Sequence, residues 1–497
     1  MASTSMRTPS NPITKGVFCY NTRKHLLARL ISNSSFFGRK LVDNSLSYST
    51  STSGKKTLRN RSELVRVSGL NATSESHSFD VVIVGAGVIG LTIARQFLIG
   101  SNLSVAVVDA AVPCSGATGA GQGYIWMIHK TPGSDKWELA MRSRKLWEMF
   151  AESIQHQGMN PVEILGWKKT GSLLVGRTAD DTVKLSRTVE KLSEAGLGAK
   201  FLSSNDLLVE EPALMVGKEG GAAFLPDDFQ LNARLMVACI EKANRQFTSE
   251  GRYAEFYYEP AISLLRSGST GEVEGVQTLN YILNAKKAVV IAAGCWSGSL
   301  MQDLMRDSNT DLAVPVKPRK GHLLVIENFK CFKLNHGLME VGYIDHEAAT
   351  LQPSASDSGP IYHAQTPSIS MAATMDTSGN LVLGSSRQLA GFGTEVEESI
   401  LNSIWERAGE FFPALKEISL RDYSKSREVR VGLRPYMPDG KPVIGPVPGL
   451  SNLFLATGHE GEGLTLALGT AEMVADMVLG NPLKVDHVPF AVQGRCC

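Results

Sequence analysis

Residues 79–110 read FDVVIVGAGVIGLTIARQFLIGSNLSVAVVDA, and the fold of the whole chain follows from this stretch. An apolar, β-branched run over 81–84 has the length and composition of a buried parallel strand. Apolar residues at helical spacing follow over 91–98, and a turn over 100–102 leads to a second predicted strand that ends on Asp109. Strand, helix and strand in this order predict a βαβ unit in a parallel sheet.

Three glycines in G-x-G-x-x-G spacing separate the first strand from the helix. In a dinucleotide-binding turn the first glycine allows the tight turn, the second admits the pyrophosphate, and the third lets the helix pack on the strand. The free N–H groups at the start of the helix attract phosphate. Asp109 stands 19 residues after Gly90, where an acid accepts hydrogen bonds from the adenosine ribose. The predicted dinucleotide-binding residues are Gly85, Ala86, Gly87, Val88, Ile89, Gly90, Asp109 and Ala110.

Two other interpretations of this stretch are disfavoured. A glycine-rich turn in an unrelated α/β protein does not require an acid at the end of the second strand. A transmembrane helix is disfavoured because the apolar run over 81–94 is too short to span a bilayer and contains three glycines. We therefore expect no membrane span.

Residues 1–70 have the composition of an organelle transit peptide. The stretch up to Ser62 is rich in Ser and Thr, carries 11 basic residues and has Asp43 as its one acid. It lacks the long apolar centre of a secretory signal, and its Met-Ala-Ser opening favours a plastid (chloroplast) over a mitochondrion. The alternative is a disordered tail that is never cleaved. We expect cleavage between about residue 50 and the strand that begins near Phe79.

Composition narrows the class of protein further. The chain has a formal net charge of +1, so removing the basic leader leaves a body of net charge −9, which argues against a nucleic-acid partner. With 20% charged and 43% hydrophobic residues the chain resembles an ordinary soluble globular protein. The seven cysteines form no C-x-x-C pair and no His cluster has metal-ligand spacing, so we expect reduced thiols and no metal.

Three further stretches place glycine-rich turns after predicted strands. SGATGAGQG, residues 115–123, follows the ribose-binding strand, and its backbone N–H groups are suited to a second part of a long cofactor. VVIAAGCWS, residues 289–297, is a buried strand that opens a helix, and residues 453–465 end in HEGEGLT before another helix. The candidate cofactor residues in these stretches are Thr118, Gly119, Ala120, Gln122, Gly123, Ala293, Gly294, Trp296, Gly461, Glu462, Gly463, Leu464 and Thr465.

The body is too long for one compact core, and we expect two intertwined domains. The predicted fold class is α/β, with a Rossmann-like dinucleotide-binding domain and an interleaved α+β substrate domain that contains a largely antiparallel sheet. The cofactor domain is assigned to residues 78–130, 221–300 and 430–482. The substrate domain is assigned to residues 131–220 and 301–429, which carry no nucleotide motif of their own.

These stretches, together with GLRPYMPDGKPVIG at 432–445 and LATGHEGEGLTLA at 455–467, resemble in sequence and in order the D-amino acid oxidase family of FAD-dependent oxidoreductases. The resemblance covers nearly everything from Phe79 to Gly480. The ending GHEGEGLTLA is most similar to the branch that holds cyanide synthases, opine oxidases and D-hydroxyproline dehydrogenases, near the glycine oxidases. The resemblance implies FAD bound across the sheet and oxidation of a small amino or imino acid by hydride transfer to flavin N5.

In relatives the Arg of G-x-R-P pairs with the substrate carboxylate, and here that residue is Arg434. A planar guanidinium gives a carboxylate two parallel charge-assisted hydrogen bonds, which fixes the α-C–H over the cofactor ring. The alternative for Arg434 is a surface position or an internal salt bridge.

Two departures from the family pattern bear on the site. Some relatives attach FAD through a Cys near residues 432–439, but no Cys stands between 332 and 495, so non-covalent FAD is expected. Glycine oxidase has a substrate-side Tyr just before the strand that matches 381–384, whereas the corresponding Met371–Met375 contains none. The roles of His459 and Glu460 stay open, with a buried pair that shapes the loop as one alternative.

Other classes remain as alternatives. Arg434 would hold the carboxylate of a 2-hydroxy acid equally well, so a flavin-dependent 2-hydroxy acid dehydrogenase is possible on sequence grounds. An NAD(P) enzyme is disfavoured by the three further flavin-type motifs. A non-catalytic flavoprotein assembly factor is the non-enzyme alternative. The sequence leaves the electron acceptor open among oxygen, a quinone and a carrier protein.

Overall fold

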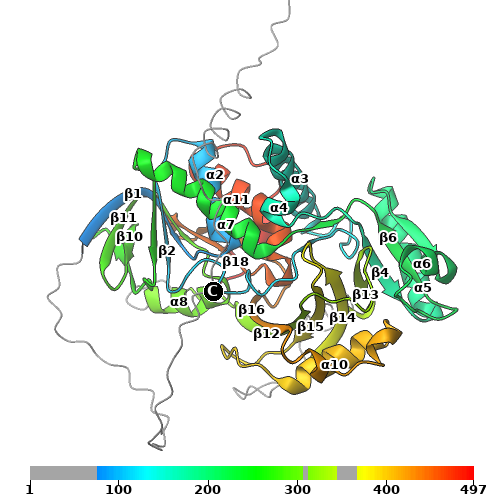
Figure 1. The fold of residues 1–497 in the computed structure, drawn as a ribbon. Helices are drawn as coiled ribbons and strands as arrows, with labels where there is room; N and C mark the ends of the chain where they lie inside the picture. Colours follow the sequence, from blue (N-terminus) through cyan, green and yellow to red (C-terminus); the bar gives the residue numbers. More distant parts are fainter. Residues whose placement is uncertain (1–74, 306–311, 344–366, 497) are drawn as a thin grey trace, which may run out of the picture. The chain divides into compact units, whose positions relative to one another are not determined.

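The computed structural model describes residues 75–305, 312–343 and 367–496 (Figure 1). The predicted transit peptide, residues 1–70, lies outside the described residues and stays a prediction. Two eight-stranded sheets and a small two-stranded sheet, β3 (Tyr124–Ile125) with β7 (Phe229–Gln230), form the body.

The first sheet grows from the quoted stretch. Its central strand pairs in parallel with β2 on one side and β11 on the other, and β17 closes one edge in the antiparallel direction. The order along the sheet is β17 (Val443–Val447), β18 (Leu450–Thr457), β11 (Tyr281–Ile291), β1 (Glu75–Val84), β2 (Val105–Asp109) and β8 (Tyr253–Tyr257). Off this path, β10 (Val273–Gln277) pairs with β11, and β9 (Ser263–Arg266) pairs with β10. The parallel strands bring their carboxyl ends, and the glycine-rich turns that follow them, to one edge.

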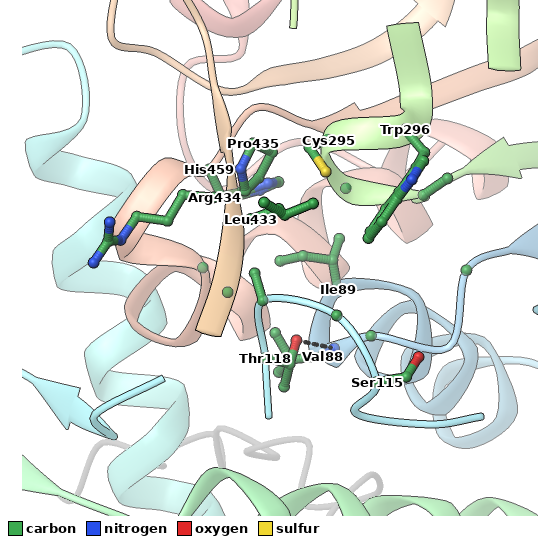
Figure 2. A pocket seen from close by; sticks show the side chains of 18 of the residues that line it. Val88, Ile89, Ser115, Thr118, Cys295, Trp296, Leu433, Arg434, Pro435 and His459 are labelled. Carbon is green, nitrogen blue, oxygen red and sulfur yellow. Dashed lines mark hydrogen bonds between the residues drawn. The ribbon is translucent and has the colours of Figure 1, made fainter. Parts of the chain in front are cut away.

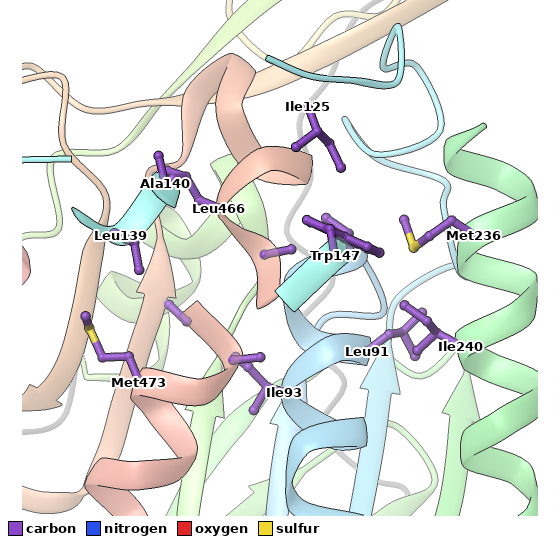
Figure 3. Packing of buried hydrophobic residues seen from close by; sticks show 14 of the residues in the cluster. Leu91, Ile93, Ile125, Leu139, Ala140, Trp147, Met236, Ile240, Leu466 and Met473 are labelled. Atoms are coloured by element: carbon purple, nitrogen blue, oxygen red, sulfur yellow. The ribbon is translucent and has the colours of Figure 1, made fainter. Parts of the chain in front are cut away.

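Four helices cover one face of this sheet, and their apolar side chains form its larger core (Figure 3). They are α2 (Val88–Gly100), α3 (Trp137–His156), α7 (Ala233–Arg245) and α11 (Gly463–Leu479). Leu91 of α2, Trp147 of α3 and Leu466 of α11 are fully buried there. Asn232 caps α7, because its side chain accepts hydrogen bonds from the N–H groups of Arg234 and Leu235. The other face is covered by α8 (Ser297–Leu304) and the β9–β10 hairpin.

The second sheet is antiparallel except for one parallel pair, β13 with β4. Its order is β16 (Arg427–Tyr436), β12 (Lys317–Ile326), β15 (Leu381–Arg387), β14 (Ser368–Met375), β13 (Gly337–Glu340), β4 (Ser172–Gly176), β6 (Gly221–Leu225) and β5 (Lys200–Ser203). Helix α10 (Glu398–Gly409) packs on β14 and β15, and α5 (Ala179–Glu194) and α6 (Ser204–Glu210) pack near β5 and β6. A parallel sheet covered by helices, joined to a largely antiparallel sheet, confirms the predicted fold class.

Two details differ from the sequence prediction. Strands β6 and β16 belong to the second sheet, so the boundaries placed at 221 and 430 put two strands of that sheet in the cofactor domain. The sequence of residues 165–175 indicates strand material, and the structure places there the end of the short helix α4 (Pro161–Leu165) and then β4. This helix forms because Pro161 stands at its first position and the Asn160 side chain accepts the N–H of Val162, and it ends at Gly166 with φ +63°.

Within the described part of the chain, every helix is too short or too polar to cross a bilayer.

Candidate active site

A cavity of about 470 Å³ runs along the carboxyl edge of the first sheet and reaches the face of the second (Figure 2). Its wall is made of the turn after β1, the loop over 109–124, the turn after β11, strands β12 and β16, and the loop between β18 and α11. Of the predicted site residues, the following line it: Gly85, Gly87, Val88, Ile89, Asp109, Ala110, Thr118, Ala120, Gln122, Gly123, Ala293, Gly294, Trp296, Arg434, Gly461, Gly463 and Leu464. Segments far apart in the sequence therefore meet at one cavity.

The three glycines of the motif have different surroundings. Gly85 has φ +117°, and a Cβ there would collide with the carbonyl oxygen of Ala292. A Cβ on Gly90 would collide with the carbonyl oxygen of Gly85, so α2 can approach β1 only because residue 90 is glycine. A Cβ on Gly87 would meet no protein atom closer than Thr118 Oγ1 at 3.4 Å, and Gly87 lines the cavity. The protein does not itself need glycine at 87, whereas a bound pyrophosphate does.

Side-chain oxygens tie the turns together. Asp109 Oδ2 accepts the N–H of Ala86 at 2.7 Å and Oδ1 accepts the N–H of Ala111 at 2.7 Å. Thr118 Oγ1 accepts the N–H of Val88 at 3.1 Å, which joins the second glycine-rich loop to the start of α2. Gln122 Nε2 donates to Val382 O at 3.3 Å and so connects this loop to the second sheet.

Five predicted cofactor residues lie behind the cavity wall, namely Ala86, Gly90, Gly119, Glu462 and Thr465. The buried carboxylate of Glu462 forms ion pairs with Lys130 and with Lys136 at 2.6 Å. Burial raises the pKa of Glu462, but the two ammonium groups outweigh it and hold the pKa well below its usual range. Its role is to fix the residue that precedes α11.

Arg434 extends from β16 on the side away from Trp296 and from the start of α2 (Figure 2). Its Nη1 donates to Ser386 O at 3.0 Å, and no described carboxylate forms an ion pair with it. Arg319, its partner across the β12–β16 register, is instead paired with Glu460. Of these two guanidinium groups Arg434 lines the cavity, so it is available to a ligand carboxylate.

Gly321 makes room for that guanidinium. A Cβ on Gly321 would overlap Arg434 Nη1 and lie 2.6 Å from Nη2, and these atoms are the far end of a flexible side chain. We expect Gly321→Ala to fold normally, to displace the Arg434 guanidinium and to lower kcat/KM by up to about a hundredfold. Steady-state kinetics beside Gly198→Ala, where a Cβ would enter open space, measure the effect. Equal kcat/KM for the two variants would mean that Arg434 is not held over Gly321 for catalysis.

The structure also brings two tyrosines into the wall that sequence reasoning did not select. The hydroxyls of Tyr124 and Tyr343 lie 2.9 Å apart, and the guanidinium carbon of Arg387 lies 3.9 Å from the centre of the Tyr343 ring. A Cβ on Gly461 would be 3.7 Å from Tyr343 Oη and 3.9 Å from Arg434 Nε, so phenol and guanidinium are neighbours. Tyr124 directly follows a predicted loop. No motif in the sequence marks Tyr343, because its position depends on the pairing of β13.

His459 is buried, and its Nε2 lies 3.0 Å from Thr470 Oγ1 in the following helix. Burial lowers the pKa of His459 to about 3, so the imidazole is neutral at physiological pH. Its position supports the alternative in which this residue shapes the loop.

The cavity fits an FAD molecule. The Gly87 cradle, the N–H groups at the start of α2 and the acid at the end of β2 accommodate a pyrophosphate and a ribose, and the wall continues past the length of a mononucleotide site to the second sheet. No cluster of His, Cys, Asp or Glu suited to a metal occurs among the residues placed by the structure.

A dinucleotide site on a parallel sheet opens onto an antiparallel sheet whose Arg434 forms no ion pair with a described carboxylate. This arrangement defines the class of two-sheet flavin oxidoreductases. The chain belongs to the DAO family of FAD-dependent oxidoreductases, because the model of that family, described as FAD dependent oxidoreductase, matches residues 80–477. The predicted family, the enzyme class and the cofactor FAD are thereby confirmed.

Individual relatives agree with this assignment. The glycine oxidase of Geobacillus kaustophilus is 25% identical over 420 residues, which cover 84% of this chain and 97% of the relative. Hydrogen cyanide synthase subunit HcnC of Pseudomonas aeruginosa is 24% identical over 452 residues, with 84% and 96% covered. The crystal structure of the Geobacillus glycine oxidase superposes with a TM-score of 0.67 at 22% identity, covering 84% of this chain and 99% of that one.

Proposed function

We propose that the enzyme oxidises the C–N bond of an amino acid, or of a secondary or cyclic amine, that carries a carboxylate, by hydride transfer from the α-carbon to flavin N5. The observation that carries the proposal is the Arg434 guanidinium on the cavity wall, which forms no ion pair with a described carboxylate. The names of the relatives, glycine oxidase among them, support an amino acid as the substrate.

Each wall residue has a task in this proposal. Arg434 binds the carboxylate through two parallel hydrogen bonds and so fixes the direction of the α-C–H bond. The tyrosine pair, Tyr124 and Tyr343, limits the space beside the bound carboxylate and supplies hydroxyl groups. Bound FAD supplies the two-electron acceptor.

An anaerobic titration tests the proposal. The purified yellow protein is mixed without oxygen with glycine, N-methyl and cyclic amino acids of both hands, and the matching 2-hydroxy acids. The proposal expects loss of the flavin absorbance with amino acids. Bleaching by 2-hydroxy acids alone would assign the enzyme to that class instead, and no bleaching by any carboxylate would favour a non-catalytic flavoprotein.

The pH dependence is expected to follow the substrate. Of the wall side chains whose pKa is displaced, none moves into the neutral range: burial lowers the pKa of His459 to about 3 and raises that of the Cys114 thiol to about 11 and of the Cys295 thiol to about 12. Hydride leaves an amine more readily when the nitrogen is neutral. We therefore expect kcat/KM to rise about tenfold per pH unit below the substrate amine pKa. Two substrates with different amine pKa values should give different midpoints, and one shared midpoint would identify a protein group instead.

We propose further that the enzyme works in a plastid. The support is the acid-poor, Ser- and Thr-rich composition of the leader, with a mitochondrion as the alternative. Residues 1–75 fused to a fluorescent protein should direct it to chloroplasts in leaf cells. A reporter that stayed in the cytosol would rule out both organelles.

A further inference from the structure

Glu460 is the acid on the cavity wall next to Arg434, and its backbone conformation is unusual. It stands in the loop between β18 and α11 and has φ +48°, a left-handed conformation that non-glycine residues rarely adopt. Glycines stand nearby at positions 458 and 461. A glycine would adopt this left-handed conformation at position 460 without strain, but the chain has a glutamate there. Such a conformation in a cavity wall points to a role for the side chain.

The carboxylate is held rigidly and ionised. Its Oε1 accepts hydrogen bonds from Arg319 Nε at 2.8 Å and Nη2 at 2.5 Å, and its Oε2 accepts the N–H of Gly461. Burial raises the pKa of Glu460, but the charges of Arg319, Arg434 and Arg387 outweigh it and leave the pKa below its usual value. A carboxylate oxygen has two acceptor sites. Arg319 fills both sites of Oε1, whereas Oε2 accepts one N–H from the described residues and has capacity for a further donor.

Glu460 and Arg434 are also neighbours in the fold. Arg319, which holds the Glu460 carboxylate, is the cross-strand partner of Arg434. Gly461, the residue after Glu460, would place a Cβ 3.9 Å from Arg434 Nε. An α-amino acid carries its nitrogen and its carboxylate on adjacent atoms, so the groups that bind the two must lie side by side, as these do.

We propose that Glu460 is the residue that recognises the substrate nitrogen, accepting its N–H while Arg434 holds the carboxylate. The inference rests on the proposed function and specifies its substrate class as a zwitterionic α-amino or α-imino acid. A charged ammonium group donates a charge-assisted hydrogen bond to the carboxylate and gains from the opposite charge, which a hydroxyl or a methylene cannot do.

The test compares two ligands that differ at one atom. D-proline and cyclopentanecarboxylate have the same ring and the same carboxylate, and only proline carries nitrogen. Their dissociation constants for holoenzyme are measured from the perturbation of the flavin spectrum, or, for proline if it reduces the flavin, from the concentration dependence of anaerobic reduction. Glu460→Gln should raise the dissociation constant of D-proline about tenfold and leave that of cyclopentanecarboxylate unchanged.

A matched control is Glu397→Gln. Glu397 accepts a hydrogen bond at 2.9 Å from Nζ of Lys320, the residue after Arg319 in β12. Glu397 does not line the cavity. This variant removes a similar ion pair and should change the dissociation constant of neither ligand. If Glu460→Gln fails to fold because Arg319 is left buried without its carboxylate, Arg319→Met with Glu460→Gln removes both charges and serves in its place.

The outcomes separate the two claims. Equal weakening of both ligands, no weakening of either, or loss of FAD from the Glu460 variants would show that Glu460 is only the partner of Arg319, with the proposed function intact. If no amino acid in the anaerobic titration reduces the wild-type flavin, the proposed function fails, and the inference falls with it.

Discussion

Gly87→Val should give a folded protein that no longer retains FAD. The nearest protein atom to a Cβ at this position is Thr118 Oγ1 at 3.4 Å, so the apoprotein has room for the side chain. The added methyl groups would enter the space proposed for the pyrophosphate, and overpacking of this kind raises the dissociation constant of FAD by about ten- to a hundredfold. Absorbance at the flavin band per unit protein, and calorimetric titration of the apoprotein with FAD, measure the change.

Two controls bracket this result. Gly198→Val adds the same side chain in open space and should keep its FAD. Gly90→Ala should lower the melting temperature of the apoprotein itself, because its Cβ would collide with the Gly85 carbonyl. Full FAD content in Gly87→Val would contradict the placement of the pyrophosphate. Because no Cys stands between 332 and 495, acid precipitation should release the flavin into the supernatant.

Arg434→Lys should reduce kcat/KM about ten- to a hundredfold without loss of FAD. Lysine keeps the positive charge but has a single ammonium group instead of a planar pair of donors, so the substrate is held less firmly. A charge-assisted hydrogen bond contributes about 1.5–3 kcal/mol in such a site, which corresponds to this range. The effect should appear in the rate of anaerobic flavin reduction at subsaturating substrate, measured by stopped flow.

Arg434→Lys also separates a substrate role from a structural one. Among the described residues the guanidinium makes one hydrogen bond, to Ser386 O, and shortening the donor should cost little stability. Unchanged reduction rates would exclude the carboxylate role. Loss of bound FAD from the variant would show that Arg434 belongs to the cofactor site.

Local features of the site could be predicted from the sequence because they are set by neighbouring residues. The distinct roles of Gly85, Gly87 and Gly90 follow from their spacing, and their surroundings in the structure correspond to those roles. Asn232 was identifiable as a helix cap because the capping side chain and its helix are contiguous.

Features that depend on long-range pairing could not be predicted in this way. The pattern of residues 222–225 indicates a strand but not that it pairs with β4 and β5 in the second sheet. The sequence HEGEG does not indicate which glutamate lines the cavity. In the structure Glu462 forms an ion pair with Lys130, whereas Glu460 lines the cavity. Tyr343 follows β13 in a segment that lies far from every motif in the sequence, so its place in the wall follows only from the fold.

The most direct test of the proposed chemistry is anaerobic rapid mixing with an amino acid deuterated at the α-carbon. The proposal predicts that the amino acid bleaches the flavin in a single kinetic phase and that deuterium slows this phase, because the α-C–H bond breaks as the flavin is reduced. An oxidised flavin in the presence of every amino acid in the panel, or reduction at the same rate with hydrogen and with deuterium, would contradict it.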